Sequence, residues 1–204
     1  MIETFYGSLK DIFQMTWPML CVSMILAISF RISYLLKTGE RIVIYKEITT
    51  FFFAFYILCL FQIVTSQDIN IYSGNNFIPF QEILRYDFGS RLFVRNIVGN
   101  VVMFIPYGYF LTYYLNEKNP LIYYFFIVLA SLSIELTQLS IGRVFDVDDI
   151  ILNVLGGIIG HFVFKLFNRI FKKMPKIFKS ELFLNVLSII LLVVFIIILI
   201  LFLL

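Results

Sequence analysis

Charged residues are scarce in this sequence. Lys, Arg, Asp and Glu together make up 14% of the 204 residues, whereas 61% are hydrophobic and 19% are aromatic. A chain with this composition has too little polar surface to cover a water-soluble globule. The net charge is only +3 and its basic residues lie beside apolar segments, so the composition gives no indication of nucleic-acid binding.

Cysteine and histidine are scarcer still. The two cysteines, Cys21 and Cys59, lie in separate apolar segments, which predicts small packing residues and no disulfide framework. His161 is the only histidine, and we expect it to be a packed or interfacial side chain toward the inner side of the membrane. No Ser-His-Asp pattern, Cys-His pair or metal-ligand spacing is evident, so the sequence predicts neither a metal site nor a cofactor.

Long apolar segments are what the sequence has in quantity. A bilayer core of about 30 Å requires roughly 20 apolar residues per helix, and backbone groups in lipid must be satisfied within the segment. The N-terminal residues lack the pattern of a cleaved signal peptide, so we expect the first segment to remain as a helix. The sequence therefore predicts an all-α, polytopic integral membrane helix bundle with about six transmembrane helices. The six segments are Thr16–Leu36, Ile48–Ser66, Ile97–Leu115, Leu121–Leu139, Ile150–Phe167 and Leu182–Leu204.

The distribution of lysine and arginine predicts the orientation. The loop after the fifth segment, KLFNRIFKKMPKIFKS (165–180), has six basic residues and no acidic one, so it should face the cytoplasm. Counting back places the loop 37–46 and the turn around Lys118 inside as well. Both termini, the 67–95 loop and the turn 140–149 then lie outside. The 67–95 loop contains three arginines that disagree with an outside location: Arg85, Arg91 and Arg95.

Polar residues gather where the fourth and fifth segments meet. Glu135 and Gln138 lie three residues apart at the end of the fourth segment, and Asp149 and Asn153 lie four apart at the start of the fifth. Residues at these spacings share one face of a helix. Arg143, in the connecting turn, is the nearest cation. The pattern predicts that two helices bring charged and amide side chains to one depth just under the outer surface.

The third segment extends this cluster. It begins on the outer side with Asn96 and Asn100, which are again four apart. An ionisable group at the helix centre costs roughly 2.5 to 3.5 kcal/mol, so such groups normally face the bundle interior and pair. The cluster could join three helices and close a turn, or it could form a pocket open to the outer leaflet, and these interpretations are compatible. The candidate ligand-binding residues are Asn96, Asn100, Glu135, Gln138, Arg143, Asp146, Asp148, Asp149 and Asn153.

Several of these residues also have a purely structural interpretation. Asp146, Asp148 and Asp149 lie near a helix start, where the dipole favours negative charge. A divalent cation could take their oxygens, but the spacing matches no known loop and the arginine would compete. Gly156 and Gly160 form a small-residue stripe that favours close helix packing.

The long outer loop combines turn residues with aromatic ones. Its SGNNFIPFQEI stretch (73–83) has Asn75, Asn76 and Pro79, which break a helix, beside apolar residues such as Phe77 and Phe80. Such a segment could lie at the membrane interface or cover the polar cluster as a lid.

These motifs, in this order and spacing, resemble the VanZ family of bacterial membrane proteins. NFIPF (76–80) is similar to its Asn-x-x-Pro-Phe segment, and NIVGNVVMFIPYG (96–108) is similar to its Asn-x-x-Gly-Asn-x-x-x-Phe-x-Pro-x-Gly pattern. IELTQ (134–138) supplies its Glu-x-x-Gln, and GRVFDVDDIILNVLGGIIG (142–160) supplies its Arg, Asp, Asn and Gly positions. The residues expected to have structural roles are Asn76, Pro79, Gly99, Pro106, Gly108, Gly156 and Gly160.

The resemblance covers about residues 51–167, and it predicts three parts. These are an N-terminal helix with a basic loop (1–47), a VanZ-like transmembrane core (48–168), and a basic cytoplasmic loop with a C-terminal transmembrane helix (169–204). The family implies a multi-pass protein of the bacterial cell membrane that is linked to glycopeptide antibiotics, particularly lipid-tailed ones such as teicoplanin.

Two classes of function remain open at this point. In the first, the protein is not an enzyme, and its polar cluster binds or remodels a membrane lipid, a cell-wall precursor lipid or the lipoglycopeptide itself. In the second, it is a membrane-embedded enzyme that modifies a lipid or envelope substrate, with Glu135 or Asp149 as general acid or base and Arg143 stabilising negative charge. Transport is less supported, because the polar residues cluster at one side. The sequence does not indicate the oligomeric state.

Overall fold

The architecture was obtained as a computed structural model that describes residues 2–65, 74–115 and 117–203. The predicted all-α fold is confirmed, since the regular elements in these ranges are all helical. Five of the helices are long and apolar enough to cross a membrane. They correspond to five of the six apolar segments; the predicted ends Ser66 and Leu204, and positions 67–73 of the predicted loop, lie outside the described residues.

The remaining segment, the third (Ile97–Leu115), forms a shorter helix. The helix α4 (Gly99–Leu115) has 17 residues, and a π-helical turn, η1 (Phe93–Val98), leads into it without a break. Pro106 lies inside α4, where its ring removes one backbone N–H from the helical ladder. The segment is therefore helical from residue 93 onward, with an irregular first turn.

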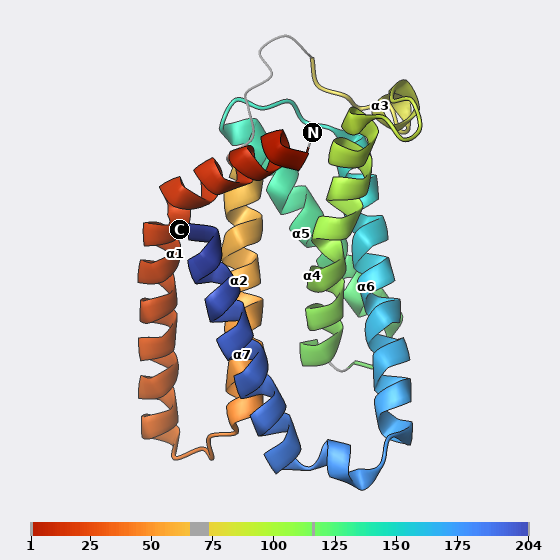
Figure 1. Cartoon of the computed structure of the whole chain (residues 1–204). Coiled ribbons are helices and arrows are strands. Elements are labelled where there is room, and N and C mark those ends of the chain that lie inside the picture. Colours follow the sequence, from red (N-terminus) through yellow and green to blue (C-terminus); the bar gives the residue numbers. More distant parts are fainter. Residues whose placement is uncertain (1, 66–73, 116, 204) are drawn as a thin grey trace. The chain divides into compact units, whose positions relative to one another are not determined.

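The chain divides into two units. The first consists of residues 1–63 and 173–204, and its helices are α1 (Ile2–Thr38), most of α2 (Ile44–Thr65), the short η2 (Lys176–Lys179) and α7 (Glu181–Leu203). Phe195 of α7 packs edge-on against Phe52 and Phe55 of α2, with ring centroids 5.2 and 5.1 Å apart. The ion pair between Arg31 and Glu47, at 2.9 Å, joins α1 to α2. Figure 1 shows these helices.

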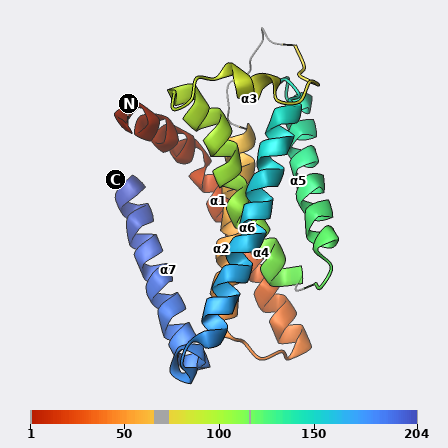
Figure 2. The same ribbon diagram turned by 90° about the vertical axis from the view of Figure 1, so that its right-hand side faces the viewer.

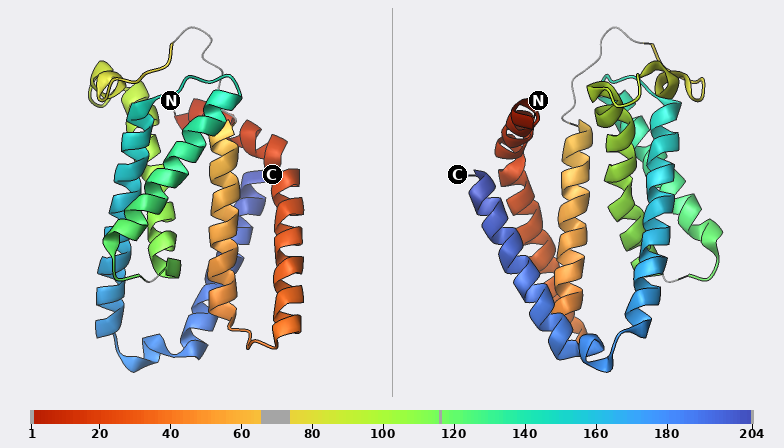
Figure 3. Two further views of the ribbon diagram at one scale, coloured as in Figure 1. Left: turned by 180° about the vertical axis from the view of Figure 1, so that it is seen from behind. Right: turned by 45° about the vertical axis from the view of Figure 1, so that its right-hand side comes forward.

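The second unit, residues 64–172, contains the polar motifs. Its helices are α3 (Gln81–Arg85), η1, α4, α5 (Pro120–Ser140) and α6 (Val147–Lys173). Asn119 begins α5 by accepting a hydrogen bond from the backbone N–H of Leu121, 3.0 Å away, with Pro120 in the first helical position. Figure 2 shows α4, α5 and α6 of this unit from a second side, and Figure 3 from two more.

Glycines allow α4 and α6 to approach closely. Gly156 of α6 faces the carbonyl of Val101, and Gly160 faces the carbonyl of Ile105 one turn further along α4. Between them, Gly108 of α4 meets the backbone of α6 directly. A Cβ atom at any of these three positions would collide with backbone of the other helix, so the crossing requires glycine there.

Candidate functional site

The predicted site residues lie at one end of the second unit, where α3, the start of α4, the end of α5 and the start of α6 come together (Figures 1 and 2). Within this end the structure separates two groups of polar contacts. One group attaches the 75–83 segment to the turn that precedes α6. The other lies between α4, α5 and α6.

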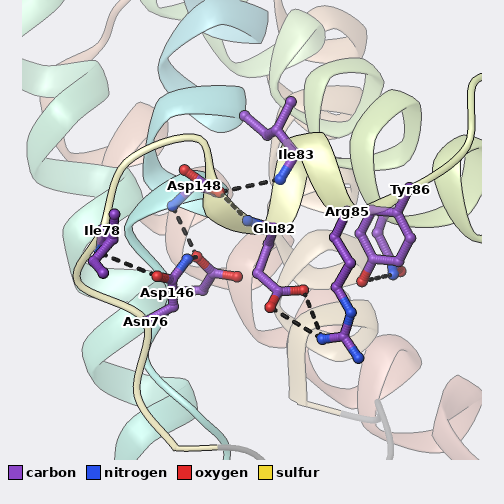
Figure 4. A network of polar contacts seen from close by, with 9 residues as sticks. Asn76, Ile78, Glu82, Ile83, Arg85, Tyr86, Asp146 and Asp148 are labelled. Atoms are coloured by element: carbon purple, nitrogen blue, oxygen red, sulfur yellow. Dashed lines mark hydrogen bonds and ion pairs between the residues drawn. The ribbon is translucent and has the colours of Figure 1, made fainter.

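Asn76 attaches the 75–83 segment by its backbone and its side chain. Its N–H donates to the carbonyl of Phe145 (2.8 Å), and its carbonyl accepts from the N–H of Val147 (3.1 Å), which makes an isolated parallel β-bridge with Asp146. Its side-chain amide donates to Asp146 Oδ1 at 2.8 Å (Figure 4). Asn76 therefore recognises a stretch of chain 70 residues away through three hydrogen bonds.

The Asp146 carboxyl group serves this attachment. Its Oδ1 also accepts from the N–H of Asp148 at 2.9 Å. Burial raises the pKa of Asp146 above the usual range, while the hydrogen bonds from Asp148 and Asn76 act in the opposite direction. The group is thus a half-buried acceptor whose charge is disfavoured by its surroundings.

Asp148 caps the short helix α3. Its carboxylate accepts from the backbone N–H groups of Phe80, Glu82 (2.7 Å) and Ile83 (3.1 Å), and the residue is only 1% exposed. Figure 4 shows the contacts with Glu82 and Ile83. Three N–H donors at a helix N-terminus satisfy a buried carboxylate well. Both oxygens of Asp148 are therefore engaged by the fold itself.

The same cap places Phe80 in an unusual backbone conformation. Its φ of 68° lies in the left-handed region, and it is the non-glycine residue with positive φ in the described part of the chain. This conformation costs of order 1–3 kcal/mol outside glycine. The contacts of Asp148 and Asn76 on either side stabilise the segment against that cost.

Glu135 belongs to the second group of contacts, and it is 1% exposed. Its Oε2 accepts from the backbone N–H of Asp146 at 3.1 Å. With its amide oriented to satisfy both neighbours, Gln138 donates to Glu135 Oε1 at 2.9 Å and accepts from Arg143 Nη1. A carboxylate, an amide and a guanidinium thus form a chain of contacts at the end of α5.

Arg143 is positioned by the turn that ends α5. Its backbone N–H donates to the carbonyl of Gln138 (3.0 Å), and the preceding Gly142 has a φ of 85°, which an L side chain rarely adopts. Its guanidinium also donates to the carbonyl of Val64 at 3.1 Å. Burial lowers the pKa of Arg143, whereas the nearby Asp149 and Glu135 raise it, and the guanidinium stays charged.

Asp149 and Asn153 continue the second group along α6. Asn100 of α4 donates its side-chain amide to Asp149 Oδ1. One turn further, Asn153 donates to the hydroxyl of Ser131 on α5 at 3.2 Å, in a fully buried contact. Three helices therefore share polar contacts, as the spacing of these residues predicts.

Asn96 lies apart from these contacts. Its amide donates to the hydroxyl of Tyr86 at 2.9 Å, so it contacts the segment after α3, whereas Asn100 contacts Asp149. Asn96 lies in the π-helical turn η1, before α4 begins at Gly99, whereas Asn100 lies in the first turn of α4.

Other contacts at this end were not indicated by the sequence. They are made by Tyr86 with Asn96 and by Ser131 with Asn153. The side chain of Asn75 also accepts from the N–H of Phe145 at 3.0 Å. Among the described residues, no group of three or more His, Cys, Asp and Glu side chains is arranged to hold a metal ion.

Comparison with known proteins agrees with the motifs at this end. The sequence model of the VanZ/LLP1 family matches residues 48–168. Protein VanZ of Enterococcus faecium is 34% identical over 77 residues, which are 37% of this chain and 47% of that protein. The chain thus spans about half the length of this curated relative. No solved structure matches. With more than half of its residues matched by the family model and five helices able to cross a bilayer, this multi-pass membrane protein belongs to the VanZ/LLP1 family.

Proposed function

We propose that this protein lowers susceptibility to teicoplanin-type lipoglycopeptides by binding or remodelling a lipid or cell-wall precursor headgroup at the outer leaflet of the bacterial cell membrane. The binding residues would be those of the second group of contacts. They are Asn100, Glu135, Gln138, Arg143, Asp149 and Asn153, which we call the helix-end cluster.

The observation that supports the proposal is the position of Glu135. It is almost fully buried at the end of a membrane-spanning helix, and its partners are Gln138 and a single backbone N–H of the turn. Asp148, equally buried, accepts three backbone N–H groups of α3. The fold needs Asp148 to hold a segment, whereas Glu135 orients a neighbouring amide and, through it, a guanidinium.

Arg143 is suited to the recognition of an anionic headgroup. Its guanidinium presents planar donors that match phosphate or carboxylate geometry. Fixing such a donor set in advance reduces the entropy lost on binding. The amides of Asn100 and Asn153 would complete the hydrogen bonds to the sugar or peptide part of a headgroup, while its acyl chains lie among the apolar helix faces.

The experiment is to measure fluorescent teicoplanin on susceptible Gram-positive cells that carry an empty vector, the native protein, Arg143→Ala or Glu135→Gln at matched membrane levels. We expect the native protein to lower drug binding and both variants to return it to the empty-vector level. Arg85→Ala is the matched control, because Arg85 is an exposed arginine at the same end that pairs with Glu82. This control should protect like the native protein.

Two other outcomes would contradict the proposal. If native and variant proteins protect equally, the helix-end cluster is not the binding site. If the native protein gives no protection, the family membership does not extend to this activity. A lipid profile that changes on expression and reverts with Glu135→Gln would favour the enzymatic alternative instead.

A further inference from the structure

Polar residues continue along the α5–α6 contact beyond the helix-end cluster. On α5, Tyr123, Ile127, Ser131 and Glu135 are spaced four apart, and all four are at most 3% exposed. Residues at this spacing form one line along a helix. This line therefore runs through the interior of the unit over three helical turns.

A matching line runs along α6. Asn153, Gly157 and His161 are also spaced four apart and buried. Asn153 contacts Ser131, the side chain of Ile127 lies against Gly157, and the His161 ring lies 4.7 Å from the ring of Tyr123. The two lines thus meet residue by residue, and we call this contact the α5–α6 seam.

The hydrogen bonds of His161 determine its tautomer. The Thr112 hydroxyl on α4 donates its single proton to the carbonyl of Gly108 at 2.7 Å. The same oxygen lies 3.0 Å from Nδ1 of His161, and with its own proton given to Gly108 it accepts there, which assigns the ring proton to Nδ1. The neutral ring then presents Nε2 as a bare acceptor.

Two acceptors in the seam lack a donor among the described residues. They are Nε2 of His161, which is 0% exposed, and Oδ1 of Asn153. An unsatisfied buried polar atom is costly, and buried water is the usual donor at such positions. Each acceptor has a hydroxyl group nearby. The hydroxyl of Ser131 on α5 contacts Asn153, and the hydroxyl of Thr112 on α4 contacts His161.

Between the two acceptors lies one apolar contact. They are eight residues apart on α6, or about 12 Å along the axis. Ile127, 0% exposed, fills the space above Gly157 between them, and its side-chain atoms would collide with a Cβ there. An isoleucine side chain in this position excludes water from the middle of the seam.

We propose that the α5–α6 seam is a gated proton pathway in which His161 binds the proton and Ile127 is the barrier. A proton entering from the Glu135 end binds Nε2 of the neutral ring, and the resulting imidazolium releases the Nε2 proton to water toward the other membrane face, which restores the tautomer with the proton on Nδ1. One proton enters and one leaves, with no change of oxidation state. The titratable groups around the ring are Tyr123 and Tyr124 of α5, and Lys165 lies one turn further along α6.

The tautomer and its access to water can be measured on the native protein. Because His161 is the only histidine, ¹⁵N-histidine labelling of the full chain in lipid bilayers gives one pair of ring signals. We expect a protonated Nδ1 and an unprotonated Nε2 with a cross-peak to water. A protonated Nε2, or an Nε2 without water contact, would overturn the proposal.

Proton flux tests the barrier. In proteoliposomes with an internal pH dye and a potassium diffusion potential, native protein and Ile127→Val should pass protons slowly. Ile127→Ala should raise the flux at least ten-fold, and adding His161→Gln should return it to the native level, because glutamine can form hydrogen bonds but does not take up a proton. Equal flux in the native protein and Ile127→Ala, or raised flux that survives His161→Gln, would overturn the pathway. This result is independent of drug binding, so it does not decide the proposed function.

Discussion

At the scale of single residues, two equally buried acidic side chains have different roles in this protein. Asp148 and Glu135 are each 1% exposed, and both lie where α5 and α6 meet. Asp148 accepts backbone N–H groups and fixes α3, whereas Glu135 contacts an amide side chain that in turn contacts Arg143. Asp148 is therefore a structural cap, whereas Glu135 orients neighbouring side chains.

Removing the charge of Asp148 should destabilise the protein. In Asp148→Asn, one carboxylate oxygen becomes an NH₂ group facing backbone donors, which leaves buried N–H groups unsatisfied. Such losses cost about 1–3 kcal/mol each, so we expect a clear drop in thermal stability in detergent. Glu82→Gln is the control, because its partly exposed pair with Arg85 contributes at most about 1 kcal/mol. Equal melting temperatures for both variants would exclude the capping role.

Asp146 should make stability depend on pH. Burial raises its native pKa, so the folded state binds the proton more tightly than the unfolded state does. Its contribution to the free energy of unfolding is therefore fully present below the ordinary aspartate pKa, and it is lost as the pH rises through the raised pKa of the folded state. The hydrogen bonds that its carboxyl group accepts from Asn76 and Asp148 both use Oδ1, which Asp146→Asn retains. As the pH rises, the melting temperature of the native protein should fall relative to that of Asp146→Asn. A constant difference between the two melting temperatures across pH would contradict this.

At the scale of the elements, the close crossing of α4 and α6 holds Asn100 against Asp149 at the helix-end cluster. The crossing depends on backbone contact at Gly156 and Gly160 of α6 and Gly108 of α4. Because packed interiors tolerate little added volume, this part of the unit should respond to a single methyl group.

Gly156→Ala should therefore lower stability by about 1–3 kcal/mol, the usual cost of overpacking. Its Cβ would meet the carbonyl of Val101, a backbone atom that cannot rotate away. Gly99→Ala is the matched control, because a Cβ there would lie 3.7 Å from the carbonyl of Val94, an ordinary contact. Thermal unfolding in detergent followed by size-exclusion chromatography measures both. A Gly99→Ala variant that is the less stable of the two would show that the crossing is not the limiting contact.

The sequence predicted the elements better than their contacts. Apolar segment lengths were enough to locate the spanning helices, because the bilayer sets their length. The π-helical turn at Asn96 was not predictable, since the four-residue spacing of Asn96 and Asn100 is equally compatible with a regular helix. Nor could the sequence predict that Asp148 caps α3 while Glu135 contacts side chains, because the partners of Asp148 lie more than 60 residues away in the sequence.

The α5–α6 seam was likewise not predictable from the sequence. Ser131 and Tyr123 are unremarkable in an apolar helix, and His161 lies far from the acidic residues in sequence order. Only the pairing of α5 with α6 aligns them, through the contacts of Asn153 with Ser131 and of His161 with Tyr123. Helix pairing is set by backbone approach at glycines, which spacing suggests without identifying the partner helix.

At the scale of the whole molecule, the side of the membrane on which α3 lies decides whether the helix-end cluster can meet an external drug. Lysine and arginine in the 165–180 loop favour α3 outside. Asp87 follows α3 and Lys176 follows α6, and both are exposed, with the helices α4, α5 and α6 between them. If all three span the bilayer, these positions lie on opposite faces whichever way the chain is inserted.

Cysteine labelling tests the orientation. With Cys21 and Cys59 replaced by alanine, Asp87→Cys should react with a membrane-impermeant maleimide on intact cells, and Lys176→Cys should react only after permeabilisation. The reverse pattern would place the helix-end cluster at the cytoplasmic face, where an external lipoglycopeptide cannot reach Arg143, and the proposed function would fail. Labelling of both positions on intact cells would show that α4, with 17 residues, does not complete a span. The expected pattern alone places Glu135 and Arg143 where a headgroup of the outer leaflet can bind.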